Sequence, residues 1–273
     1  MGSEQGVVLA VTVHQPDERL AAMIEEYLPA LVSCYAAATA FCSQETHPSI
    51  LHLLRSHGVH VHVNTQASIG IRRIGEVRRR TVGAGLLEGT SHLQMCDFDR
   101  ALHWVAHYPE ELRAVIKDIP NYDFLVLGRT ERAWATHPPY QAETEPLFNH
   151  VFALATGRAW DVGAGSRGLS RRAAEFLLEI SKEQTVGTDA EWPLLILNQD
   201  GFVTSQRLCE GLEFETADRF GPEIDAAGGY REWEARVSAD PKQWVFRLEV
   251  ALMIAQAAAR TPTAKSNSNI GRR

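Results

Sequence analysis

The chain has 273 residues, of which 45% are apolar, 22% charged and 8% aromatic, as in an ordinary globular protein. Its 27 lysines and arginines stand against 34 aspartates and glutamates, and the net charge of −7 excludes a generally basic nucleic-acid-binding protein. No run of about 18 apolar residues is present, so we expect no transmembrane segment. The polar N-terminus predicts no signal peptide, and four cysteines without a C-x-x-C pair predict reduced thiols in a cytoplasmic protein.

The first half of the chain predicts strands that alternate with helices. Residues 7–13 form a β-branched apolar run that is typical of a buried strand, and 35–41 is a strand with helix as the alternative. In chain order we predict a strand over 7–13, a helix over 17–28, strands over 35–41 and 59–63 around a helix over 46–56, a helix over 71–87, a strand over 92–96, a helix over 102–116 and a strand over 124–127. This alternation predicts an α/β fold with a mostly parallel central sheet flanked by helices on both faces.

The second half predicts mainly helices. Residues 132–146 have no clear periodicity, and so long an irregular stretch indicates a functional loop. Helices are expected over 147–154, 170–180, 191–198 and 244–260. We expect a single domain over 1–260, and a polar, disordered tail over 261–273.

Two carboxylates, Asp97 and Asp99, stand at the end of the strand over 92–96. Carboxylates at i and i+2 can share one divalent cation, and Mg²⁺ and Mn²⁺ prefer such oxygen ligands and also bind diphosphate oxygens. The alternative is a solvated strand end, because a D-x-D pair alone is a weak signal.

Five arginines lie within nine positions upstream of this pair: Arg72, Arg73, Arg78, Arg79 and Arg80. Guanidinium groups bind phosphates through bidentate hydrogen bonds. The alternative is a solvated helix face, and we expect it to hold for at least three of the five.

Three further patterns have competing interpretations. Residues 161–168 contain G-x-G-x-x-G and resemble the first motif of class I methyltransferases, although the preceding segment is poor as a strand. His60 and His62 suggest a metal pair of the amidohydrolase type, but no histidine follows His150, which favours strand packing. Asp189 and Glu191 stand at a helix start, where a carboxylate can be a general base or, with Thr188, part of an N-terminal cap.

Taken in order, these segments resemble the GT-A glycosyltransferases, in particular family-two enzymes of the polyprenol-phosphate mannose synthase type. Residues 122–129, YDFLVLGR, are similar to their y-D-x-V-x-G-S-R segment. Residues 161–173 are similar to their acceptor-side D-x-x-x-G-x-R-x-x-S-R-x-A segment. Asp97-Phe98-Asp99 stands where that family has its metal-binding D-x-D motif, and 71–89 is similar to the Arg- and Gly-rich stretch that meets the donor diphosphate.

The resemblance implies a metal-dependent transfer of a sugar from a nucleotide-diphosphate donor to a hydroxyl of a small-molecule or lipid-linked acceptor. It implies Mg²⁺ or Mn²⁺ on Asp97 and Asp99, with Asp189 as the base and Glu191 in reserve. The donor would be bound by the residues Arg72, Arg73, Arg79, Arg80, Asp97 and Arg129.

The chain departs from this family at its first strand, where His14-Gln15-Pro16-Asp17-Glu18 replaces P-x-Y-N-E. A late histidine ligand and the Q-x-x-R-W motif of processive synthases are also absent. These departures keep a non-catalytic nucleotide-sugar-binding protein open as an alternative, with a SAM-dependent methyltransferase behind it.

Overall fold

The computed structural model describes residues 6–65 and 70–261. Its centre is a seven-stranded sheet in the order β3-β2-β1-β4-β6-β5-β7. The strands are β1 (Val7–Val13), β2 (Ala37–Cys42), β3 (His60–Val63), β4 (His92–Asp97), β5 (Phe124–Arg129), β6 (Ser166–Ser170) and β7 (Thr204–Cys209). All neighbouring pairs are parallel except those of β6, which runs antiparallel to both β4 and β5. The predicted α/β class with a mostly parallel sheet is thereby confirmed.

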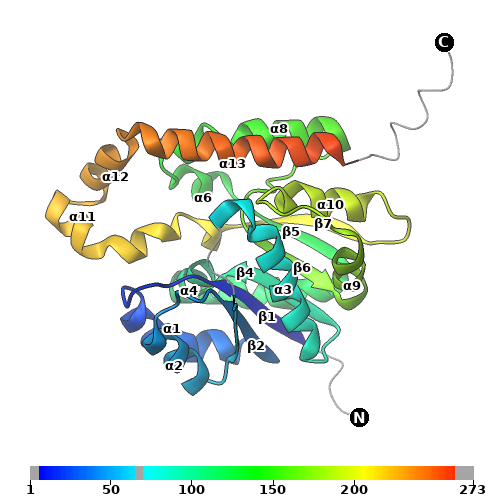
Figure 1. The fold of residues 1–273 in the computed structure, drawn as a ribbon, viewed down its shortest axis with the longest axis horizontal. Helices are drawn as coiled ribbons and strands as arrows, with labels where there is room; N and C mark the ends of the chain where they lie inside the picture. Colours follow the sequence, from blue (N-terminus) through cyan, green and yellow to red (C-terminus); the bar gives the residue numbers. More distant parts are fainter. Residues whose placement is uncertain (1–5, 66–69, 262–273) are drawn as a thin grey trace.

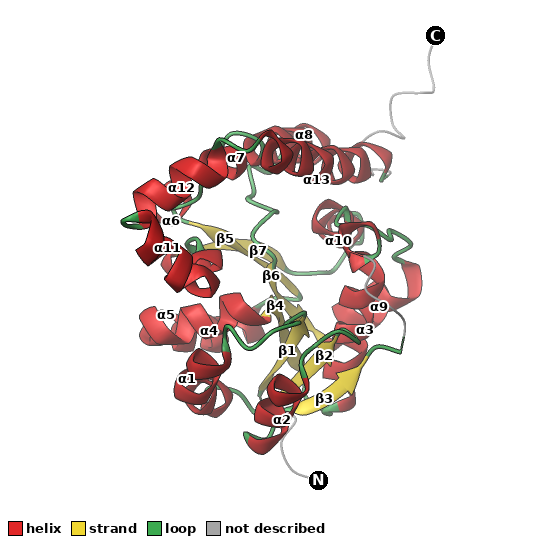
Figure 2. Cartoon of the chain, turned by 60° about the vertical axis from the view of Figure 1, so that its left-hand side comes forward, coloured by secondary structure: helices red, strands yellow, loops and turns green. Residues whose placement is uncertain are grey.

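Helices cover both faces of the sheet (Figure 2). One buried cluster lies under α1 (Ala21–Ser33), α2 (Pro48–Ser56), α4 (Phe98–His107) and α5 (Pro109–Asp118). The other lies under α3 (Ile74–Leu87), α9 (Arg171–Ile180) and α10 (Thr188–Leu197). β1 is buried along nearly its whole length between β2 and β4, which explains why its sequence is a continuous apolar run.

A pair of helices lies beyond the sheet edge, across the top of Figure 1: α8 (Glu145–Thr156) and α13 (Pro241–Arg260). α13 contributes Val250 and Ile254 to the second cluster, and α8 contributes Phe148 and Phe152. The segment between β7 and α13 contains η3 (Glu210–Leu212), η4 (Glu215–Phe220), α11 (Gly221–Ala227) and α12 (Tyr230–Ser238). The C-terminal part of the chain thus packs α13 against α8 and α10.

Two predictions about elements were wrong, and one strand of the sheet's centre was not predicted. The helix expected over 102–116 is two helices, because Pro109 has no N–H for a continuous helix and begins α5 instead. The expected loop over 132–146 contains α6 (Glu131–Ala135) and α7 (Pro139–Ala142), the first capped by Thr130, whose Oγ1 accepts from the N–H of Ala133. No strand was predicted over 166–170, where the structure has β6.

The tail over 262–273 and the first five residues lie outside the described part of the chain. Within 6–65 and 70–261, no helix is both long and apolar enough to cross a membrane.

Candidate functional site

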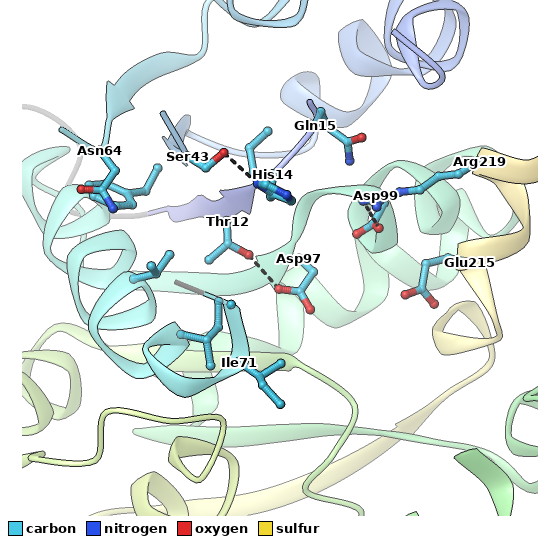
Figure 3. A pocket seen from close by; sticks show the side chains of 15 residues that line it. Thr12, His14, Gln15, Ser43, Asn64, Ile71, Asp97, Asp99, Glu215 and Arg219 are labelled. Atoms are coloured by element: carbon cyan, nitrogen blue, oxygen red, sulfur yellow. Dashed lines mark hydrogen bonds and ion pairs between the residues drawn. The ribbon is translucent and has the colours of Figure 1, made fainter. Parts of the chain in front are cut away.

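An outer cavity of about 360 Å³ opens where β1, β2 and β4 end (Figure 3). The carboxyl ends of parallel strands meet at one edge of a sheet, and ligands of open α/β sheets bind there. The lining includes Thr12, His14, Ser43, Asn64, Asp97 and Asp99. The predicted D-x-D pair therefore lies in a cavity, and not on a solvated strand end.

The two carboxylates of this pair have different partners (Figure 3). The Oδ1 atom of Asp97 accepts a hydrogen bond of 2.7 Å from Thr12 Oγ1, its partner across the β1–β4 pairing. Its Oδ2 atom receives no hydrogen bond from any described residue, so one oxygen is open to a cation. Asp99, in the first turn of α4, forms an ion pair of 2.6 Å with Arg219 Nη2. A divalent cation thus fits Asp97 directly, whereas Asp99 must first exchange Arg219 for it.

A second, inner cavity of about 210 Å³ adjoins the first. Four guanidinium groups line it, those of Arg78, Arg100, Arg129 and Arg247. Four carboxylates do so as well, those of Asp97, Glu145, Asp189 and Glu215. Asp97 and Glu215 are in the lining of both cavities, so the two spaces meet at these side chains.

Gly165 lies at this junction. Its φ of +68° is unfavourable for residues with a side chain, and a Cβ there would stand 2.9 Å from Asp97 Oδ2. Glycine at this position therefore lets the loop before β6 approach the free oxygen of Asp97.

Asp189 faces the inner cavity from the first turn of α10. It is only 3% exposed, and its Oδ1 accepts from Arg78 Nη1 at 2.9 Å and Arg167 Nη2 at 2.6 Å. Its Oδ2 accepts no hydrogen bond from the described residues. The capping alternative does not describe Asp189, because the helix has no side-chain cap bond and Gly187 occupies the N-cap position.

Glu191 is turned away from both cavities. Its carboxylate accepts hydrogen bonds from Ser181 Oγ at 2.6 Å and from the backbone N–H groups of Lys182 and Glu183. These contacts hold the turn between α9 and α10, which is a structural role.

The arginine cluster divides as the helical geometry of α3 requires. Arg72, Arg73 and Arg80 are exposed and form ion pairs with glutamates at the surface. Arg79 donates to Ser181 Oγ and to the carbonyl of Glu183. None of these four lines either cavity, whereas Arg78, the fifth, is buried and reaches the inner one.

Arg129, at the end of β5, reaches the inner cavity but its donors are largely occupied. Its Nε and Nη2 donate to Asp161, and Nη2 also donates to Glu145 at 2.6 Å. Its guanidinium carbon lies 3.9 Å from the centre of the Trp134 ring. Burial raises the pKa of Asp161, but Arg129 outweighs that effect and lowers it to about 2. Arg129 is therefore a fixed part of the wall.

The charged residues of these walls that were not predicted as site residues include Arg100, Glu215, Arg219 and Arg247. Burial raises the pKa of the Glu215 carboxyl, although the adjacent Arg100 opposes this, with Nη2 2.8 Å from Glu215 Oε1. Arg100 follows the D-x-D pair directly, which is the one sequence signal that could have drawn attention to it. The other three lie more than 110 positions from that pair, and only tertiary packing brings them there.

A separate group of metal-ligating side chains lies on α4 and η4. One ligand atom each of His103, His107 and Asp218 lie within 4.8 Å of one another. Both ring nitrogens of His103 are already hydrogen-bonded, Nδ1 to Asp218 at 2.8 Å and Nε2 to Glu213 at 3.0 Å. This arrangement suits an imidazolium between two carboxylates.

The two remaining sequence patterns lie elsewhere. The loop before β6 contains Gly163 and Gly165 and leads into an antiparallel strand, whereas the methyltransferase motif requires a strand-to-helix turn. His60 is on the edge strand β3 and pairs with Glu88, outside both cavities.

A scan against models of protein families finds no family that matches this chain. A search of curated proteins finds no relative of it either. The functional argument therefore rests on the geometry of the two cavities.

Proposed function

We propose that this protein is a metal-dependent glycosyltransferase with a GT-A-type fold, which moves a sugar from a nucleotide-diphosphate donor to an acceptor hydroxyl. The observation that carries the proposal is the position of Asp97 in the wall of both cavities. A transferase needs two substrates to meet at one point, and here a carboxylate with a free oxygen stands at that point.

The outer cavity is the donor site in this proposal. Its volume of about 360 Å³ is within the range of small-molecule sites. A Mg²⁺ or Mn²⁺ ion on Asp97 and Asp99, when bound, supplies positive charge that stabilises the leaving diphosphate. Arg219, released from Asp99, remains at the same wall and can pair with a phosphate oxygen.

The inner cavity is the acceptor site. Asp189 lines this cavity and keeps one carboxylate oxygen without a hydrogen bond from the described residues. A carboxylate at this position can take the proton of the acceptor hydroxyl as the glycosidic bond forms. Arg78 and Arg167 hold the other oxygen and so fix the orientation of the carboxylate.

One observation favours a non-catalytic nucleotide-sugar-binding protein as the second candidate. Both Asp99 and Asp189 are already in ion pairs with arginines, so the two carboxylates that chemistry requires are partly engaged. Turnover of a bound donor separates the two candidates, because only the enzyme releases the sugar.

Nucleotide binding tests the donor site. GDP, UDP, CDP and ADP are titrated calorimetrically in Mn²⁺ and in EDTA, and we expect one of them to bind in a metal-dependent manner. The Asp97→Ala/Asp99→Ala double variant should lose this binding and keep its fold by circular dichroism. Asp200→Asn, a change at an exposed carboxylate, is the matched control. Unchanged binding in the double variant, or no metal-dependent binding in the parent, would refute the proposed site.

A further inference from the structure

Arg247 is the least occupied arginine of the inner cavity. It extends from α13 into the lining, and its side chain is 19% exposed. Its guanidinium donates no hydrogen bond to any described residue, and its nearest carboxylate oxygen, Glu145 Oε1, is 3.5 Å away. Burial lowers the pKa of Arg247, and Glu145 only partly opposes this. A partly buried cation with open donors is typical of an anion-binding site.

Two neighbouring arginines also keep unused donors. Arg100 uses Nη2 for Glu215, while its buried Nε and Nη1 have no hydrogen-bond partner within the described chain. The buried Nε of Arg78 likewise has none there. Native proteins rarely leave buried polar groups unpaired, so such a group of donors calls for an explanation by a ligand, an ion or water.

Two of the carboxylates of the same wall, those of Glu145 and Asp189, already form ion pairs with arginines. Glu145 pairs with Arg129 through Oε2 at 2.6 Å, and Asp189 pairs with Arg78 and Arg167. Among the buried side-chain atoms of this wall that have no partner in the described chain, three are guanidinium nitrogens, Arg78 Nε and Arg100 Nε and Nη1, and one is a carboxylate oxygen, Glu215 Oε2. The unpaired groups are therefore mainly donors, which fits an anion.

The size of the cavity limits the ligand. About 210 Å³ is below the range of drug-sized ligand sites, so the space suits a phosphate or carboxylate with a few carbon atoms. Asp189 lines the same space and would meet a hydroxyl of that ligand.

We propose that the inner cavity binds a small anionic acceptor, a molecule that carries a phosphate or carboxylate beside its reactive hydroxyl, and that Arg247 is the principal residue that binds the anion. This inference rests on the proposed function, because it names the class of the second substrate. In the reaction the acceptor oxygen bonds to the anomeric carbon, the bond from that carbon to the diphosphate breaks, and the hydroxyl proton passes to Asp189.

Calorimetric titration with inorganic phosphate, and separately with lactate, tests the anion site in EDTA without nucleotide. We expect at least one of the two probes to bind the parent protein and to bind Arg247→Gln at least tenfold more weakly. Arg247→Lys should lie between them, since it keeps the charge and loses the planar set of donors. Arg260→Gln is the matched control on the same helix, because Arg260 pairs with Glu183 outside the cavity. Binding of neither probe to the parent, or equal binding to Arg247→Gln, would overturn the inference.

The phosphate group of the acceptor could belong to a lipid or to a small molecule. A vesicle experiment distinguishes these two alternatives. In a co-sedimentation experiment with phosphatidylcholine vesicles that contain phosphatidic acid, we expect the parent protein and Arg247→Gln to bind the vesicles equally. Arg247-dependent sedimentation without binding of either small probe would overturn the assignment to a small acceptor.

The same titrations separate this inference from the proposed function. Metal-dependent nucleotide binding without Arg247-dependent anion binding contradicts the inference alone. Arg247-dependent anion binding in a protein that binds no nucleotide diphosphate supports the anion site and overturns its assignment to an acceptor.

Discussion

Asp189 and Glu191 stand two residues apart at the start of α10, yet their surroundings differ completely. The first lies in the inner cavity between two guanidinium groups, and the second holds the turn at Ser181. Residues two apart on a helix point in different directions. Only one of Asp189 and Glu191 can therefore face a given site. The sequence pattern left both as candidates for the base, and the structure brings only Asp189 to the inner cavity.

A pair of conservative substitutions separates the two roles. Asp189→Asn should lower kcat by roughly 10²–10⁴-fold in the transfer reaction, because the amide cannot accept the proton. It should also lower the free energy of unfolding, since Arg78 and Arg167 lose the charge that compensates them. Glu191→Gln should reduce stability and leave kcat within a fewfold of the parent.

Steady-state kinetics with the donor found by titration, together with urea unfolding, measures both effects. A parental kcat in Asp189→Asn would exclude it as the base. A large loss of kcat in a folded Glu191→Gln would move the base there.

The arginines illustrate how far residues of a site can be recognised from sequence. Charge density drew attention to the five arginines over 72–80, but an α-helix distributes consecutive residues around its axis, and only Arg78 faces inward. Arg78 is three, four and seven positions from Gly75, Val82 and Gly85, which are buried on the same helix. This helical spacing was the feature of the sequence that could have singled out Arg78. No local pattern marks Arg247, which reaches the cavity only because α13 packs beside α8.

At the scale of elements, the segment of η3 and η4 is attached to α4 by several charged contacts. His103 lies between Glu213 and Asp218, and Arg100 pairs with Glu215. This segment also carries Arg219, the partner of Asp99, so its position affects the outer cavity. The attachment should depend on the charge of His103.

Burial lowers the pKa of His103, but its hydrogen bonds and charge interactions with Asp218 and Glu213 outweigh burial and raise that pKa above its usual value. A raised folded-state pKa gives stability that is complete below the unfolded pKa of about 6.5 and is lost as pH rises through the folded one. The free energy of unfolding contributed by this contact should therefore decrease from pH 6 to pH 9.

Urea unfolding in EDTA across that range measures the contribution. The difference in stability between the parent and His103→Gln should shrink as the pH rises. His52→Gln, at an exposed position on α2, serves as the control and should show a constant difference. A pH-independent difference for His103→Gln would contradict the charged contact.

Helices and strands could be predicted where a short stretch of sequence determines them by itself. The buried strands β1 and β5 are visible in the sequence as apolar runs, and the starts of α2 and α9 as a proline and a serine. The N-cap of α2 is His47 and not Thr46, the candidate in the sequence. β6 was missed because residues 166–170, SRGLS, have neither alternation nor β-branched residues. This strand is formed by its pairing with β4 and β5 on both sides, which is a long-range effect.

At the scale of the whole molecule, α13 attaches the C-terminal end of the described chain to α8 and α10. Its inner face buries Val250, Ile254 and Ala257, while Leu252 on the same helix is 58% exposed. The helix that carries Arg247 is thus held by apolar packing on one side only.

Ile254→Ala should lower the free energy of unfolding by about 2–5 kcal/mol, because it removes a fully buried side chain and leaves a cavity. Leu252→Ala, the control on the same helix, should change it by no more than about 0.5 kcal/mol. Chemical denaturation of both variants makes the comparison. Equally small losses would mean that α13 is not packed into the second buried cluster as described.

The shared wall at Asp97 and Glu215 has a consequence for equilibrium binding. Ligands on either side of one charged wall do not bind independently, and a cation held at Asp97 would favour an anion beyond it. Linkage makes this cooperativity reciprocal: whatever factor the nucleotide–metal complex adds to the affinity for phosphate, phosphate adds to the affinity for the nucleotide. The ratio of these affinities, with and without the second ligand, is a direct measure of the free energy transmitted through that wall.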